Sequence, residues 1–299
     1  MKLNLLIFGV SGLLGNNVAK VLSKKYNILG TYFRNKPNFD KKVTIKLIKI
    51  DLSKTNVKKS SYINKFKPKI ILNCAGEANV DYCEKNHLYS KKIIVSATKI
   101  ISNFAKKNKA YFINISTDSL FDGKRKYYSE NDKVRPINYY SKFKAESEKF
   151  LNLTNKNCLI IRTRFYGKNI TNKLCFSEEI IYNLKKKQII KCYNNVYNTQ
   201  ISCLNLAKIL DECIKKKIVG IYNIVGNERC SKINFAREIA NVYGLDKSLI
   251  KSKKYFNKKN SVTKPLDTSL SNKAIKKIIK TPILSLRKGI YQIYRQGNQ

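Results

Sequence analysis

The sequence predicts an α/β fold that consists of a doubly wound parallel sheet and a second, smaller α/β lobe. Three observations lead to this prediction. Through the first half of the 299 residues, short β-branched or aliphatic runs alternate with longer segments of helical spacing. The first apolar run ends in a glycine-rich stretch that opens a helix, and the alternation loosens after Gly167. Strands that alternate with helices favour right-handed crossovers and a parallel sheet covered on both faces.

Residues 1–165 contain the elements that we expect to form the sheet. Each expected strand is short and apolar, and each expected helix lies between two strands. The expected strands are Asn4–Phe8, Tyr26–Tyr32, Ile45–Ile50, Lys69–Asn73, Tyr111–Ile115 and Cys158–Arg162. The expected helices lie near residues 13–25, 53–66, 85–107 and 139–153. We expect elements within 196–218 to complete this domain.

Residues 166–299 predict the smaller lobe. Its expected helices are shorter and lie near 177–187, 204–217 and 231–243, with one strand at Gly220–Val225. The Lys- and Asn-rich stretch Lys251–Lys259 predicts a loop. We place this lobe at the carboxyl edge of the sheet, because doubly wound folds bind their ligands there.

The charge of the chain favours an anionic partner only weakly. Lys and Arg number 61 against 19 Asp and Glu, which gives a formal net charge of +42. Such a charge is typical of proteins that bind nucleic acid or anionic membranes. However, only nine of the basic residues are Arg, whereas base readout and bidentate phosphate binding favour the Arg fork. We therefore expect no nucleic-acid partner; the alternative requires a basic face and binding that weakens steeply with salt.

The composition also excludes several kinds of site. The single histidine, His87, argues against Ser-His-Asp chemistry and excludes a site with several His ligands to a metal. The eight cysteines never lie close enough in sequence to form a C-x-x-C pair, so we expect ordinary reduced thiols and no metal site. The apolar run Leu3–Val10 is too short for a signal-peptide core, and no run approaches a membrane span. We expect a cytoplasmic protein with no membrane partner.

The first strand–helix junction predicts a dinucleotide-binding site. Gly9, Gly12 and Gly15 follow the strand Asn4–Phe8, and the helix begins within this stretch. Glycines let the backbone approach a pyrophosphate, while the helix N-terminus offers free N–H groups to the anion. An ordinary strand-to-helix turn is the alternative. The position at the start of an alternating chain favours dinucleotide binding.

The end of the second strand indicates which dinucleotide is bound. A carboxylate there would hold the ribose hydroxyls of NAD, whereas a basic residue would accept the 2′-phosphate of NADP. The strand ends in Thr31-Tyr32-Phe33-Arg34, so we predict NADPH as the cofactor, although an Arg by chance is the alternative in so basic a chain. Asp51, with Leu52 after the third strand, either faces the adenine amine or caps the next helix.

Four side chains predict carbonyl chemistry at the same edge of the sheet. Thr117 and Asp118 follow the fifth strand, and Tyr140 and Lys144 lie four residues apart at the start of a helix. A neighbouring ammonium favours the phenolate, so we expect the pKa of Tyr140 to be lowered and the tyrosine to act as a proton donor to a carbonyl oxygen. The neighbouring Tyr139 is followed four residues later by Phe143 and not by a lysine, so Tyr140 is the predicted proton donor.

With these motifs the chain resembles the extended short-chain dehydrogenase/reductases and, within them, the dTDP-4-dehydrorhamnose reductase family. The resemblance covers nearly the whole chain. Its most specific part runs from Ser116 through Gly123, Tyr140 and Lys144 to Glu146. Further matching segments are Gly9–Gly15, Leu72–Gly76, Val80–Glu84, Arg162–Gly167, Gly220–Asn223 and Lys264–Ser269.

The resemblance implies a role for each matching residue. Thr117 would donate a hydrogen bond to the substrate carbonyl, Tyr140 would protonate that carbonyl, and Lys144 would bind the nicotinamide ribose. Asp118 and Phe165 would contact the sugar. The residues implied to line the dinucleotide are Gly9, Ser11, Gly12, Leu13, Leu14, Gly15, Arg34, Asp51, Leu52, Cys74, Ala75, Gly76, Tyr140 and Lys144.

The resemblance implies reduction of dTDP-4-dehydro-L-rhamnose to dTDP-L-rhamnose for cell-surface polysaccharide. Three positions depart from the family pattern. Ile94 stands where an Asn is usual, Ser141 stands where a Gly is usual, and Phe165 stands where a Trp is usual. Two alternatives stay open. One is a reductase or epimerase of another nucleotide-activated keto sugar. The other is a non-catalytic NADP-binding subunit like methionine adenosyltransferase β. The sequence leaves a homodimer open.

Overall fold

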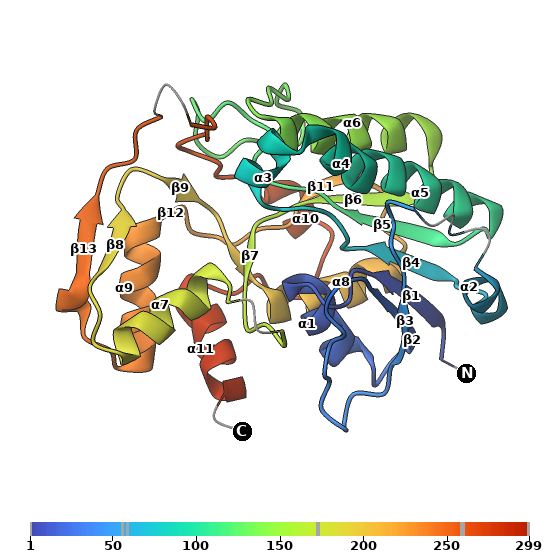
Figure 1. Ribbon diagram of the computed structural model, residues 1–299, viewed down its shortest axis with the longest axis horizontal. Coiled ribbons are helices and arrows are strands. Elements are labelled where there is room, and N and C mark those ends of the chain that lie inside the picture. The colour runs from blue at the N-terminus through green and yellow to red at the C-terminus, as the bar shows by residue number, and fades with distance from the viewer. Residues whose placement is uncertain (1, 55–56, 58–59, 172–173, 258–260, 298–299) are drawn as a thin grey trace.

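A computed structural model describes residues 2–54, 57, 60–171, 174–257 and 261–297. Its centre is a seven-stranded parallel sheet in the order β11-β6-β5-β4-β1-β2-β3 (Figure 1). The strands are β1 (Asn4–Phe8), β2 (Asn27–Tyr32), β3 (Lys46–Lys49), β4 (Ile70–Asn73), β5 (Tyr111–Ile115), β6 (Cys158–Arg162) and β11 (Gly220–Asn223). The predicted doubly wound α/β fold is confirmed, and the sheet order reverses direction between β1 and β4.

The central strands are buried because helices cover both faces of the sheet. Every residue of β4, β5 and β6 is buried, as expected for continuous apolar runs in a parallel sheet. On one face, Val18 of α1 (Leu13–Leu22) and Leu210 of α8 (Cys203–Lys216) share a core with Ile7 and Ile113. On the other face, α2 (Ser61–Phe66), α5 (Ala97–Lys107) and α6 (Tyr139–Thr154) pack on a second core.

Two predicted helices differ from the structure. Of the predicted helix 53–66, the described residues show a 3-10 conformation at Val57 and the α-helix α2, which Ser60 caps; 55–56 and 58–59 lie outside the described residues. The predicted helix 85–107 is divided into α3 (Val80–Lys85), α4 (His87–Lys91), the π-helical segment η2 (Lys92–Ser96) and α5. Asn86, at φ −125° and ψ 49°, separates α3 from α4.

The smaller lobe is built from three helices and short strand pairs (Figure 1). Its core lies among α7 (Phe176–Lys185), α9 (Lys232–Tyr243) and α11 (Leu286–Gly297). The strand pairs are β7 (Phe165–Tyr166) with β10 (Ile201–Ser202), β9 (Tyr197–Asn198) with β12 (Cys230–Ser231), and β8 (Ile190–Tyr193) with β13 (Ile250–Lys253). The short helices η3 (Lys247–Leu249) and α10 (Lys273–Lys276) complete the elements.

The lobe corrects one prediction and adds an element. The sequence predicts a loop over Lys251–Lys259, but residues 250–253 form β13, which pairs in parallel with β8; 258–259 lie outside the described residues. Only Ile250 of β13 is buried, so the strand carries little hydrophobic signal. The helix α11 is not among the predictions, and it packs through Ile290 and Ile293.

The chain returns from the lobe to the sheet. After β10, α8 packs beside α1, and β11 pairs with β6 at the edge of the sheet. We retain 1–165 and 166–299 as the proposed division, with α8, β11 and α10 as elements of the second part that lie on the sheet.

Candidate active site

Two adjoining cavities open at the carboxyl edge of the sheet. The first, of about 250 Å³, lies over the ends of β1, β2 and β4, and the second, of about 330 Å³, lies between the sheet and the smaller lobe. Both are lined by Cys74, Ala75, Gly76 and Glu77, which follow β4. A ligand could therefore extend from one cavity into the other along this segment.

The glycine loop brings the start of α1 close to the sheet. Gly9 has a φ of +79°, and a Cβ there would lie 2.8 Å from the backbone of Ala75. A Cβ on Gly15 would lie 2.4 Å from the carbonyl oxygen of Gly9. Gly12 precedes α1 without a side-chain cap, and its carbonyl accepts from Asn16 N at 3.0 Å. The N–H groups of the first turn thus have no partner within the helix and can bind an anion.

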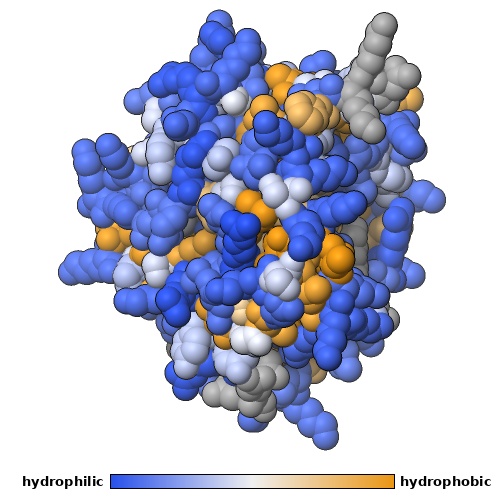
Figure 2. All heavy atoms as spheres, turned by 90° about the vertical axis from the view of Figure 1, so that its left-hand side faces the viewer, coloured by the Kyte–Doolittle hydropathy of each residue, from blue (hydrophilic) through white to orange (hydrophobic). Residues whose placement is uncertain are grey.

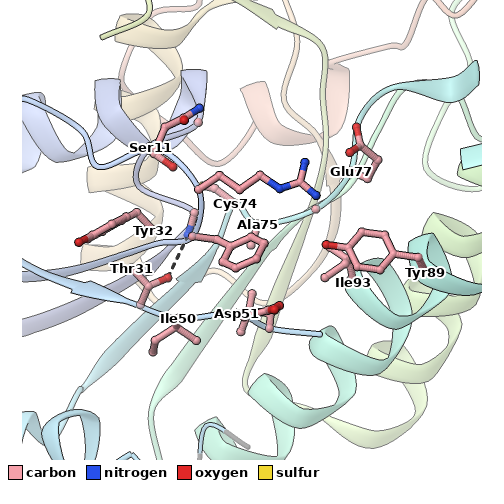
Figure 3. A pocket seen from close by; sticks show the side chains of 17 residues that line it. Ser11, Thr31, Tyr32, Ile50, Asp51, Cys74, Ala75, Glu77, Tyr89 and Ile93 are labelled. Carbon is pink, nitrogen blue, oxygen red and sulfur yellow. Dashed lines mark hydrogen bonds between the residues drawn. The ribbon is translucent and has the colours of Figure 1, made fainter. Parts of the chain in front are cut away.

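The first cavity brings together most of the residues predicted to bind the cofactor. Figure 3 shows Tyr89 and Ile93 on one side of it and Thr31 and Tyr32 on the other. The predicted residues among its lining are Gly9, Ser11, Gly12, Arg34, Asp51, Leu52, Cys74, Ala75 and Gly76. Lining residues that are not among the predictions are Thr31, Tyr32, Phe33, Asn35, Ile50, Glu77, Tyr89 and Ile93.

Leu13, Leu14 and Gly15 are not among the residues lining either cavity, so their contact with the dinucleotide stays a prediction. Leu14 lies on the face of α1 that packs against the sheet, and its side chain is buried in the core there. Gly15 provides the close approach to Gly9 instead. What these three residues can offer a ligand is the backbone of the first turn of α1.

Arg34 and Asp51 both line the first cavity. The guanidinium of Arg34 lies 5.7 Å from the ring centroid of Phe33, at the end of β2. Asp51 accepts hydrogen bonds from the backbone N–H of Ser53 at 2.9 Å and from its hydroxyl at 2.6 Å. Asp51 therefore orders the turn after β3, whereas the cap of α2 is Ser60.

All five residues predicted for catalysis and substrate binding line the second cavity: Thr117, Asp118, Tyr140, Lys144 and Phe165. The capping box of Asn138 and Ser141 starts α6 just before Tyr140. Further lining residues that are not among the predictions include Arg164, Cys175, Phe176, Gln200 and Phe235. Apart from the neighbours Cys175 and Phe176, they come from separate parts of the fold, so no local sequence pattern joins them.

Lys144 is held by the end of β5. Its Nζ donates a hydrogen bond of 2.9 Å to the carbonyl oxygen of Ile115. A Cβ on Gly76 would lie 3.7 Å from this Nζ, an ordinary van der Waals contact, so the segment after β4 lies directly beside the ammonium. Burial lowers the pKa of Lys144 to about 8.

The predicted lowering of the Tyr140 pKa is wrong for this structure. Burial raises the pKa of Tyr140 to about 12, and the hydrogen bond with Thr117, which acts in the opposite direction, does not outweigh burial. Lys144, which donates to the Ile115 carbonyl, is not among the groups that shift this pKa. Tyr140 thus carries its proton throughout the neutral range, as a proton donor must.

Asp118 is buried at the floor of the second cavity and is surrounded by donors. Its Oδ1 accepts from the hydroxyls of Thr117 at 3.3 Å and Ser119 at 3.1 Å. Its Oδ2 accepts from the hydroxyl of Thr268 and lies 3.5 Å from Nη1 of Arg164. These contacts suit Asp118 to positioning Thr117 and Arg164.

The carbonyl of Ile94 joins η2 to α6. It accepts hydrogen bonds from the hydroxyls of Thr98 at 2.7 Å and Ser147 at 3.0 Å. The Ile94 side chain is buried beside Cys83 and Phe143. An apolar contact thus fills the position where the resemblance implies an Asn.

Within the described ranges, no group of three or more His, Cys, Asp or Glu side chains could hold a metal ion. None of the helices in the described part of the chain is both long and apolar enough to cross a membrane. The expected cytoplasmic location stays a prediction. Figure 2 shows hydrophilic side chains over most of one face of the molecule, with smaller apolar areas among them.

A glycine-rich βα junction beside a cavity with Thr, Tyr and Lys defines the class: a Rossmann-type protein built like the extended short-chain dehydrogenase/reductases. The family model described as the RmlD substrate binding domain matches residues 1–298. The chain belongs to this family.

Three curated relatives show how far the similarity extends. A "probable low-salt glycan biosynthesis reductase" of Haloferax volcanii is 24% identical over 251 residues, which are 82% of each chain. A dTDP-4-dehydrorhamnose reductase of Aggregatibacter actinomycetemcomitans is 29% identical over 57% of this chain and 55% of the relative. Methionine adenosyltransferase 2 subunit beta of Xenopus tropicalis is 30% identical over 52% of this chain and 45% of that protein. The matches to the last two thus span about half of each relative.

Two solved structures resemble the whole chain. A hypothetical dTDP-4-dehydrorhamnose reductase from Sulfolobus tokodaii superposes with a TM-score of 0.81 at 29% identity, over 97% of this chain and 99% of the other. A dTDP-4-dehydrorhamnose reductase from Bacillus anthracis in complex with NADP has a TM-score of 0.85 at 21% identity, over 99% of both chains. The second likeness supports the fold.

Proposed function

We propose that this protein is an NADPH-dependent reductase of the C4 keto group of a nucleotide-activated sugar, converting dTDP-4-dehydro-L-rhamnose to dTDP-L-rhamnose for cell-surface polysaccharide. The observation that carries the proposal is the second cavity. It gathers Thr117, Tyr140 and Lys144 against the segment Cys74–Glu77 that it shares with the first cavity. A cofactor in the first cavity would therefore end beside the three polar groups.

The residues of the first cavity suit NADP. The free N–H groups after Gly12 suit the pyrophosphate, and Arg34 suits the 2′-phosphate at the end of β2. Gly76 and Lys144, which both line the second cavity, suit the nicotinamide ribose. When bound, NADPH supplies the hydride for the reduction. The NADP present in the Bacillus anthracis relative supports this choice.

The residues of the second cavity can supply the proton, the hydrogen bond and the positive charge that reduction of a carbonyl group requires. Tyr140 holds its proton at neutral pH, so it can donate that proton to the carbonyl oxygen as negative charge develops there. Thr117, which interacts with the Tyr140 hydroxyl, can donate a second hydrogen bond to the same oxygen. Lys144 remains an ammonium below about pH 8 and is fixed by Ile115, so it adds positive charge without moving.

A non-catalytic NADP-binding subunit is the second candidate, because methionine adenosyltransferase 2 subunit beta is 30% identical over 159 residues. That match covers only 45% of the relative, whereas the family model matches residues 1–298. Retention of Thr117, Tyr140 and Lys144 together favours an enzyme, since a binding module needs no proton donor. A sister reductase or epimerase of another nucleotide sugar would use the same groups.

The loss of NADPH absorbance on mixing the protein with dTDP-4-dehydro-L-rhamnose tests the proposal. NADH and a GDP-keto sugar serve as comparison arms. Oxidation confined to NADPH with the dTDP sugar is the expected result. Oxidation with the GDP sugar alone would show that the substrate is a GDP sugar and not the proposed dTDP sugar. NADPH binding without oxidation in any arm would favour the non-catalytic NADP-binding subunit.

A further inference from the structure

Two cations from different elements lie at or close to the second cavity. Arg164 lies in the link between β6 and β7 and lines the cavity beside Phe165. Lys232 is the first residue of α9, which Ser231 caps by accepting from Asn234 N at 3.3 Å. We call Arg164 and Lys232 the cation pair.

The ammonium of Lys232 lies behind an aromatic ring of the cavity and is not itself among the lining residues. It is 5.4 Å from the ring centroid of Phe176, which lines the cavity, and 5.5 Å from that of Tyr193. Phe235, one turn further along α9, lines the same cavity. Lys232 is half-buried, so its ammonium is held between aromatic faces rather than extended into water.

The positive charge around the cation pair exceeds the negative charge. Among the residues that the structure describes, no carboxylate forms an ion pair with Lys232. The nearest carboxylate of Arg164 is Asp118, at 3.5 Å, and Asp118 also accepts from Thr268. Lys264 is paired with Asp81 at 2.7 Å.

The environment of Lys232 shows the same excess. Burial lowers the pKa of Lys232 to about 8, and repulsion from Arg164 and Lys264 acts in the same direction; Cys192 and Asp118 oppose it. A half-buried cation next to other cations is costly unless an anion joins them. Because no carboxylate of the described residues pairs with Lys232, its charge is open to an anionic ligand.

We propose that Arg164 and Lys232 form the binding site for the diphosphate of the nucleotide-sugar substrate. The proposal rests on the proposed function and specifies its substrate contacts. Arg164 offers a planar fork and Lys232 a compact charge, which together suit two linked phosphates. The site lies on the lobe side of the cavity, apart from the glycine loop, so the pyrophosphate of NADP would not occupy it.

The geometry also sets the direction of the substrate. The keto sugar would lie toward Tyr140 and Thr117, and the diphosphate would lie outward against Arg164 and Lys232. The rings of Phe176 and Tyr193 would then flank the phosphates and shield the charges from water. A low-dielectric wall of this kind strengthens the attraction between the cation pair and an anion.

Binding of dTDP to the NADPH-saturated protein tests the proposal by calorimetry. The principal variant is Lys232→Met, which removes the charge but keeps an unbranched chain, and Lys232→Arg is the conservative rescue. The matched control is Lys99→Met, because the Lys99 ammonium also lies over a ring, Phe150, at 5.3 Å, and this ring, unlike Phe176, lines neither cavity. Thymidine, which has no phosphate, is the comparison ligand.

We expect Lys232→Met to weaken dTDP binding about tenfold or more, because a charge-assisted hydrogen bond is lost. Thymidine and NADPH should bind as in the parent protein, and Lys232→Arg should restore most of the dTDP affinity. An unchanged dTDP affinity in Lys232→Met would overturn the cation-pair site and leave the reductase proposal standing. If the parent protein with NADPH bound none of dTDP, UDP and GDP, the result would contradict both the nucleotide-sugar function and the diphosphate site at the cation pair.

Discussion

The Nζ of Lys144 donates a hydrogen bond of 2.9 Å to the carbonyl oxygen of Ile115. This contact joins the second turn of α6 to the last residue of β5, two residues before Thr117. The ammonium is therefore positioned by the sheet rather than by Tyr140. As a result, the tyrosine keeps a high pKa while the lysine presents its charge to the space beside Gly76.

Replacement of Tyr140 by Phe should abolish most turnover. The ring stays in place and only the hydroxyl is lost, so we expect a fall in kcat of about 100-fold or more with little change in the Kd for NADPH. Stopped-flow or steady-state oxidation of NADPH measures the first quantity, and fluorescence titration the second. A variant that kept most of its rate would show that another group donates the proton.

The rate of reduction should fall as the pH rises through about 8. Lys144 is charged below its pKa of about 8 and neutral above it, whereas Tyr140 keeps its proton to about pH 12. The required state, with both groups protonated, is thus lost on the alkaline side. We expect a flat kcat/KM from pH 6 to pH 7.5 and a decline above pH 8.

The profile should be measured in Lys232→Met as well, because Lys232 also has a pKa of about 8. If Lys144 is responsible, the decline should persist in that variant. A profile that is flat to pH 10 in the variant would assign the decline to Lys232 and remove Lys144 from the pH dependence.

The sequence predicts the sheet and the polar side chains at its edge because both depend on local signals. Strands β4, β5 and β6 are continuous apolar runs, and Thr117 directly follows one of them. Residues at or beside the cavity that are not among the predictions, such as Arg164, Phe176 and Lys232, come from different elements. Only the tertiary fold brings these residues together, so no spacing in the sequence predicts that they belong to one site.

The Tyr140 pKa shows a second kind of limit. The spacing of Tyr140 and Lys144 predicts that they share a helix face, and both line the second cavity. The spacing carries no information on burial, which raises the tyrosine pKa, or on the Ile115 carbonyl, which accepts from the lysine. Competing partners from β5 therefore decide the electrostatics of the pair.

A buried ion pair beneath α6 should be essential for stability. Arg162 of β6 bonds Glu148 through Nε at 3.1 Å and Nη2 at 2.8 Å, with side chains that are 4% and 5% exposed. In Glu148→Gln the Arg162 charge is left buried without a counter-ion. We expect a loss of about 3–5 kcal/mol in the free energy of unfolding, measured by urea denaturation.

The control lies on the same helix. Glu146 pairs with Lys91 and Lys99 at 3.5 Å, but its side chain is 39% exposed. Glu146→Gln should therefore cost less than about 1 kcal/mol. Equal losses in the two variants would mean that burial of the Arg162 pair has no special effect on stability.

Replacement of Gly15 by Ala should remove dinucleotide binding. Its new Cβ would lie 2.4 Å from the carbonyl oxygen of Gly9, so the glycine loop and the start of α1 would have to move apart. Such a shift displaces the N–H groups proposed to hold the pyrophosphate. We expect the Kd for NADPH, measured by fluorescence titration, to rise by about tenfold or more, as expected when charge-assisted hydrogen bonds are lost.

Gly244→Ala is the matched control for this prediction. Gly244 ends α9 with a φ of +62°, and a Cβ there meets nothing within 4 Å. The substitution should cost about 1 kcal/mol of stability through backbone strain and leave NADPH binding unchanged. If both variants weakened NADPH binding equally, the effect of Gly15→Ala would reflect general destabilisation. If neither did, the glycine loop would not be the pyrophosphate site.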